Sequence, residues 1–335
     1  MRNSTNFSLL ILAFAALFSQ PVQAMSRTLC VYDPGGGNGD IYNMMKDYKV
    51  AAKAWGVDFK MKPYTDEKTA SEDFKAGQCK AVLMTGTRVR QYHRFSGSME
   101  AMGALPTYPL LKKVTRTLSG KKASKLMVNG DYEVAGVLPG GAIYLLVRDR
   151  KVDTVAELAG KRIATLEYDA ASKKMVRHVG AAIVAADVGT FSGMFNNGSV
   201  DAAYAPATAY KALELYKGIG KKGGVIQYPL AQMTMQLLIR SKDFPAEFGV
   251  KSRGHLAKQF DAALKMVKAA ESSIPKKHWI QIPDVDKVRY DQMFLDVRVQ
   301  LRDKAKIYNG RMLKLLRKIR CKKDAARAEC AEKRE

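Results

Sequence analysis

The sequence has no long apolar run and few acidic residues. The apolar run from Leu9 to Phe18 covers ten residues, about half of the ~20 that a membrane-spanning helix needs, which excludes a polytopic membrane protein. Hydrophobic residues still make up 47% of the 335 residues, which excludes a disordered chain, a collagen and a coiled-coil rod. The composition is that of a globular protein with one large or two medium cores.

Motifs of catalysis and metal binding are missing as well. There is no GxSxG nucleophile elbow, and no HExxH or HxH spacing relates the four histidines, His93, His178, His255 and His278. We therefore expect no enzyme activity, no metal and no cofactor. A loop carboxylate such as Glu167 or Asp169 could act as a base, but a solvated surface carboxylate is the favoured interpretation.

The first 24 residues have the features of a secretory signal peptide. Arg2 gives a positive start, the apolar run follows, and Val22-Gln23-Ala24 places small residues at the cleavage site. We expect the mature chain to begin at Met25 and to reside in the periplasm. An exported protein is a poor partner for nucleic acid, despite a net charge of +24.

The four cysteines agree with export, because an even number in an exported protein suggests disulfides. Four cysteines allow three pairings, and proximity along the chain favours Cys30–Cys79 and Cys321–Cys330. The first pair would join two neighbouring strands. Two reduced, buried thiols remain the alternative for either pair.

Two α/β units follow one another along the chain. Strand, helix, strand, helix and strand are predicted between residues 28 and 85, and the same alternation returns between residues 142 and 239. From Phe248 onward the periodicity is almost entirely helical. We expect a first lobe from residues 25–130 and 240–335, which includes the C-terminal helices, and a second lobe from residues 131–239.

Two turns at predicted strand ends are candidate binding segments. The glycines of Gly35–Gly39 do not fit GxGxxG or a Walker loop, but a strand-to-helix turn of glycines can offer backbone N–H groups to an anion. A tight turn without a ligand is the alternative. In Thr85–Arg90, hydroxyls and two guanidinium groups follow the third strand, at the edge where α/β sheets bind ligands. The alternative makes the threonines helix caps and the arginines solvent-facing.

A basic amphipathic helix is predicted near the C-terminus. The segment from Arg311 to Lys323 carries seven basic residues and no acidic one, with an apolar stripe of Met312, Leu313, Leu315, Leu316 and Ile319. Such a helix can lie on anionic lipid. Docking on its own domain with a solvated basic face is the favoured interpretation.

A likeness to a known family is carried by four segments: Thr85–Arg90, Gly103–Tyr108, Thr154–Ile163 and Phe191–Ala202. The resemblance is to periplasmic solute-binding proteins, the receptors of TRAP transporters, whose entry into the second lobe is similar to Thr154–Ile163. It implies an α/β, two-lobe periplasmic-binding-protein fold of type II with a helical C-terminal cap. The chain is also similar to a group of solute-binding proteins of Gram-negative bacteria, some of which are labelled accessory proteins of resistance-nodulation-division efflux.

The resemblance implies a ligand site between the lobes. From the first lobe we expect Gly36, Gly37 and Asn38 in the glycine turn, and Thr85, Thr87 and Arg88, with Arg88 pairing with any carboxylate. From the second lobe we expect Glu167, Tyr168 and Tyr204. One departure concerns the arginine that usually holds the carboxylate four residues after the glycine of G-x-K-I-R. Here that position is Ala164, which leaves a neutral, zwitterionic or cationic solute open.

The expected function is capture of a small polar solute, such as an organic acid, for an inner-membrane transporter. The alternative is an envelope accessory role in multidrug efflux and drug resistance. We expect a monomer in either case.

Overall fold

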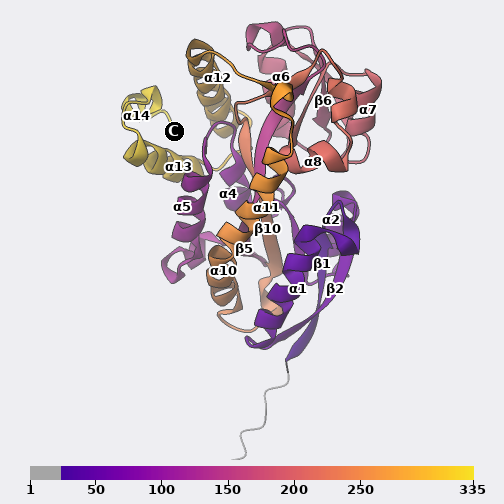
Figure 1. Ribbon diagram of the computed structural model, residues 1–335. Coiled ribbons are helices and arrows are strands. Elements are labelled where there is room, and N and C mark those ends of the chain that lie inside the picture. Colours follow the sequence, from indigo (N-terminus) through magenta and orange to yellow (C-terminus); the bar gives the residue numbers. More distant parts are fainter. Residues whose placement is uncertain (1–23) are drawn as a thin grey trace, which may run out of the picture.

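The computed structural model describes residues 24–335, so the predicted signal peptide lies almost wholly outside the described residues (Figure 1). A single mixed sheet runs through the molecule in the order β2-β1-β3-β10-β5-β8-β6-β7. The bounds of these strands are β1 Met25–Tyr32, β2 Val57–Tyr64, β3 Ala81–Thr85, β5 Tyr132–Val147, β6 Arg162–Leu166, β7 Ala182–Ala186, β8 Ala202–Pro206 and β10 Ala231–Arg240. The short strands are β4 Val128–Asn129, β9 Gly224–Ile226 and β11 Trp279–Ile280.

Each half of the sheet is built from a parallel unit with crossover helices, as predicted. β1 pairs in parallel with β2 and β3, and β6 pairs in parallel with β7 and β8. The connecting helices are α1 Asp40–Lys53 and α2 Glu67–Lys75 in the first unit, and α6 Ala170–His178, α7 Phe191–Asn197 and α8 Ala207–Ala212 in the second. The carboxyl ends of all these parallel strands therefore form the edges at which a site is expected.

Two antiparallel strands, β5 and β10, join the halves. The sequence predicted a strand only from Ala142, but β5 begins ten residues earlier, at Tyr132. Pro139, Gly140 and Gly141 interrupt the strand signal, because neither residue type favours a strand interior. The pairing of β5 with β10 continues past them through a register shift between Met233 and Thr234, and Gly141 takes a φ of +118° that glycine tolerates.

The chain after β10 is almost entirely helical, which confirms the predicted helical cap. Its helices are α10 Phe248–Lys258, α11 Phe260–Ser272, α12 Asp284–Asp303, α13 Gly310–Lys323 and α14 Ala328–Glu332. α10 and α11 pack on β5, and α10 and α13 pack on α5 (Tyr108–Ser119), as Figure 1 shows. Among the described residues, no helix combines the length and hydropathy that a membrane span requires.

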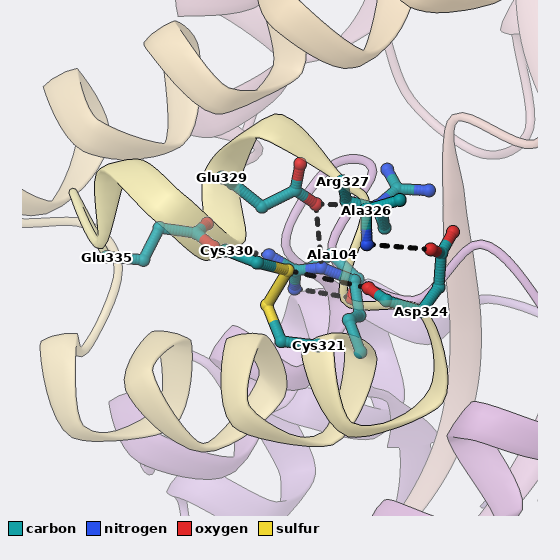
Figure 2. The surroundings of a disulfide bond; sticks show 9 residues. Ala104, Cys321, Asp324, Ala326, Arg327, Glu329, Cys330 and Glu335 are labelled. Carbon is teal, nitrogen blue, oxygen red and sulfur yellow. Dashed lines mark hydrogen bonds and ion pairs between the residues drawn. A yellow bond between two sulfur atoms is a disulfide. The ribbon is translucent and has the colours of Figure 1, made fainter.

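Both disulfides favoured from the sequence are present. Cys30–Cys79 joins β1 to the residues just before β3, with the Cα atoms 5.9 Å apart. Cys321–Cys330 joins α13 to α14, with the Cα atoms 5.6 Å apart. The second bridge lies close to Glu329 and Glu335, the two acidic residues of a buried ionic cluster (Figure 2).

That ionic cluster consists of Arg298, Arg320, Glu329 and Glu335, all of which are buried. Both guanidinium groups donate to the Glu335 carboxylate, and Arg320 also pairs with Glu329 at 3.2 Å. The same arginines donate to main-chain carbonyls at 2.7 Å, Arg298 to Met102 and Arg320 to Ala104. The cluster therefore fixes the C-terminal helices to the loop around Met102.

We predict that Glu335→Ala lowers the free energy of unfolding by about 3 kcal/mol, because two buried guanidinium groups lose their shared carboxylate. Urea unfolding followed by circular dichroism measures the change. Glu332→Ala is the control, since Glu332 is exposed and pairs only with the half-exposed Arg334. Equal unfolding midpoints for the two variants would refute the prediction.

Candidate functional site

A cavity of about 790 Å³ lies where the strand ends of the two α/β units converge. Its walls come from the residues that follow β1, β2 and β3 on one side and β6 and β8 on the other. Residues of β5, β10 and α11 also line it. Most of the lining side chains are apolar. They include six of the chain's 16 methionines, Met44, Met102, Met175, Met233, Met235 and Met266.

The Glu67 carboxylate, which has no exposed surface, joins segments from both units. It accepts hydrogen bonds from the Thr85 amide at 2.7 Å and from the Tyr168 hydroxyl at 3.0 Å. Arg88 lies 3.5 Å from the same carboxylate, and its guanidinium stacks 3.4 Å from the centre of the Tyr168 ring. Burial, with the charge of Glu67, raises the pKa of Tyr168 well above its usual value, so the phenol remains a donor.

A second ion pair also connects the two units. Arg90, which follows β3, lies 3.1 Å from Asp169, which follows β6. Asp169 further accepts hydrogen bonds from the Ala171 amide and the Ser172 hydroxyl. The Arg90 guanidinium is thus neutralised within the protein.

The glycine turn is organised by Asp33, the residue directly after β1. Its carboxylate accepts from the Gly35 amide at 2.7 Å and from the Tyr42 amide at 2.9 Å. A Cβ on Gly39 would lie only 2.1 Å from this carboxylate, so glycine is required there. The position at the start of α1 that could have held an anionic ligand is therefore occupied by the protein's own carboxylate.

Glu100 contributes another buried carboxylate. It accepts from the amides of Gly86 at 3.0 Å and Thr234 at 2.6 Å, and from the hydroxyls of Thr87 at 2.6 Å and Thr234 at 2.7 Å. Burial raises the pKa of this carboxyl group in spite of these hydrogen bonds. No direct ion pair with a basic side chain is found for Glu100 or Asp33 within residues 24–335.

Five of the nine ligand residues predicted from the sequence line this cavity: Asn38, Thr85, Thr87, Tyr168 and Tyr204. Four do not. Gly36 and Gly37 belong to the turn but face Thr65 and Pro63, Glu167 is exposed, and Arg88 is turned toward Glu67 and Tyr168. Thr85 also caps the short helix α3 (Gly86–Val89) through its hydroxyl.

The carboxylate-binding position of the resemblance, Ala164, does line the cavity. Arg162, two residues earlier, lies outside the cavity lining and forms a surface ion pair with Asp201 at 2.8 Å. Neither residue therefore brings a positive charge to the site.

Sequence reasoning missed Asp33 and Glu100. Asp33 could have been found, because it directly follows a strand in a parallel unit, where ligands bind. Glu100 had no local signal: it lies in the 3-10 helix Ser98–Glu100, between α4 (Arg94–Gly97) and α5, and reaches β10 only in the folded chain.

We predict that Arg88→Ala loosens the contact between the two units. The Tyr168 ring loses a stacked cation, worth about 1 kcal/mol, and the buried Glu67 loses its ion pair. Hydrogen exchange of residues 163–170 should become roughly tenfold faster by mass spectrometry. Arg94→Ala, which removes an exposed arginine, is the control, and unchanged exchange in the Arg88 variant would exclude this role.

Comparisons with known proteins agree with this architecture. Residues 49–335 match the family described as solute-binding protein AdeT 1/2. The chain is 41% identical to the probable solute-binding protein AdeT1 of Acinetobacter baumannii, over 90% of this chain and 99% of that protein. It is similar in fold to a TRAP periplasmic solute-binding protein of Desulfovibrio salexigens with bound orotic acid. That match has a TM-score of 0.72 at 14% identity and covers 89% of this chain and 99% of the other. A second similar structure is the TRAP periplasmic solute-binding protein of Rhodoferax ferrireducens with bound malonate, with a TM-score of 0.71 at 13% identity, covering 88% of this chain and 98% of the other. The chain is thus a member of the AdeT 1/2 family of solute-binding proteins, with the two-lobe fold of the TRAP receptors.

Proposed function

We propose that the protein works in the periplasm and captures a small solute in the cavity between its two α/β units. The observation that carries this proposal is the origin of the cavity walls, because strand ends of both units contribute and neither unit could enclose the solute alone. Family membership supports solute binding, and the similar TRAP receptors are periplasmic by name.

We further propose that the two units move as lobes, divided into residues 25–130 with 240–335 and residues 131–239. β5 and β10 run through both halves of the sheet, and their pairing shifts register near Gly141 and Thr234. A glycine pair beside a register shift is a place where two strands can bend. The contacts of Glu67 with Tyr168 and of Arg90 with Asp169 would then hold the closed form.

The proposed role is binding and delivery without chemical change of the solute, so that the protein is not an enzyme. Within residues 24–335, no histidine or cysteine lines the cavity. Two of the hydroxyl groups that line it, those of Thr87 and Ser172, donate to carboxylates. The partner would be an inner-membrane transporter that accepts the solute, and the receptor would act as a monomer.

The proposed function is tested by native mass spectrometry of the protein purified from the periplasm without refolding. We expect a small molecule bound one-to-one that is lost on denaturation. Ala205→Trp, which places a large side chain on the cavity wall, should abolish the adduct, and Ala325→Trp on the exposed surface should preserve it. Adducts that survive Ala205→Trp unchanged would place the solute elsewhere.

A second candidate function, an envelope accessory role in efflux, is favoured by one observation. Exposed basic side chains gather on three neighbouring segments, α5, the 3-10 helix Lys121–Leu126 and α13. They are Lys113, Arg116, Lys121, Lys122, Lys125, Arg311, Lys314, Lys318, Lys322 and Lys323. Met312, Leu313 and Leu316 of α13 are fully buried, so this helix offers charge and not an apolar face to a membrane.

We predict for this candidate that the protein floats with vesicles containing about 30% phosphatidylglycerol and is released by 0.5 M salt, because screened charges no longer attract. The double substitution Lys314→Glu with Lys318→Glu should weaken flotation several-fold. The matched control is Lys46→Glu with Lys60→Glu, on α1 and β2. Equal flotation of both double variants would exclude the basic segments as the contact.

A further inference from the structure

The charges that line the cavity are mostly negative. Six carboxylates line it, Asp33, Asp40, Asp66, Glu67, Glu100 and Asp169, against one basic side chain, Arg90, among the described residues. Glu67 and Asp169 are paired with Arg88 and Arg90. The other four have no cationic partner within residues 24–335, and two of these, Asp33 and Glu100, are only 4% and 5% exposed.

Four of the acidic groups lie along one edge of the sheet. Asp33 follows β1, Asp66 and Glu67 follow β2, and Glu100 is bonded to residues that follow β3 and lie in β10. These strands are neighbours in the sheet, so the four carboxylates lie on the same side of the cavity and form an acidic wall. A solute carboxylate placed there would meet like charges in a partly desolvated site.

The cavity offers a solute carboxylate neither a free helix N-terminus nor an unpaired arginine among the described residues. The start of α1 is capped by Asp33, and the position of the carboxylate-binding arginine is Ala164 on the cavity wall. The single lining guanidinium, Arg90, is already paired with Asp169. The cavity therefore lacks the free positive charge that would bind the carboxylate of an organic acid.

An aromatic side chain completes the acidic wall. Tyr32 lines the cavity and is 7% exposed, and no hydrogen-bond partner for its hydroxyl is found among residues 24–335. Burial and the charges of Glu67, Asp33 and Asp66 raise its pKa far above the usual value, so the hydroxyl stays neutral. A phenol ring beside several carboxylates is a favourable surface for an alkylammonium group.

We propose that the solute of this cavity is an organic cation: an amine or ammonium group on a largely apolar body. The charged end lies against Asp33 and Glu100, the two buried carboxylates that have no ion-pair partner within residues 24–335, beside Tyr32. The apolar body lies against the methionines and the small side chains of β5, β8 and β10. This inference rests on the proposed function, because it assigns the substrate class of the same cavity.

The test compares compounds with the same skeleton and different charge. Tryptamine, tryptophol and indole-3-propionate form one set, and 4-phenylbutylamine, 4-phenylbutanol and 4-phenylbutyrate form another. Isothermal titration calorimetry at pH 7 should show each amine binding at least tenfold more tightly than its alcohol or acid, as expected for a charge-assisted hydrogen bond. An acid or alcohol that binds as tightly as its amine would overturn the inference and leave the proposed function intact.

Two variants and a matched control test which residues cause the tighter binding of amines. Glu100→Gln can keep its hydrogen bonds, with the amide donating to the Thr87 hydroxyl, and should reduce the preference for amines roughly tenfold with little effect on the alcohols. Ala164→Arg should reverse the preference toward the acids. Glu72→Gln, an exposed position on α2, should change nothing.

Failure of the inference and of the proposed function can be told apart. Unchanged amine preference in both Glu100→Gln and Ala164→Arg would overturn the charge assignment. Binding of none of the six compounds to the wild-type protein would also overturn it. The proposed function fails separately, if native mass spectrometry finds no solute or one that is not displaced by Ala205→Trp.

Discussion

The buried carboxylate of Glu67 is the interaction on which the site depends. A carboxylate without solvent is tolerated only where donors surround it, and here the donors come from β3, from the helix that follows it and from the segment after β6. The need to satisfy this one charge brings the two α/β units together beside the cavity. Arg90 and Asp169 repeat the arrangement a short distance away.

Much of the fold could be predicted from the sequence, because the periodicity of strands and helices is local information. The parallel units, the helical cap and both disulfide pairings followed from patterns around Cys30, Gly56 and Leu256. The first half of β5 could not be predicted, since Pro139 and Gly140 are unfavourable in strands. The segment forms a strand because it pairs with the neighbouring strand β10. Arg88, predicted as a ligand residue, does not line the cavity, because its side chain pairs with the buried Glu67, a long-range contact that local sequence does not reveal.

The charge of the surface and the charge of the cavity are opposite, and only the first is visible in the composition. A net charge of +24 describes the exposed lysines and arginines, whose fields are screened within about 8 Å at physiological salt. The cavity is shielded from them and is dominated by its own carboxylates. The net charge of the chain therefore does not indicate the charge of the solute. Fold similarity to receptors of organic acids does not indicate it either, because proteins that share a fold can differ in the side chains that contact the ligand.

The methionines around the cavity have a consequence for the range of solutes. Methionine is unbranched and polarisable, so its side chain reshapes itself around different apolar bodies at low cost. Cavity walls of branched side chains would instead favour solutes of a single shape. A receptor with such adaptable walls and fixed carboxylates selects solutes by their charge and accepts solutes of several shapes.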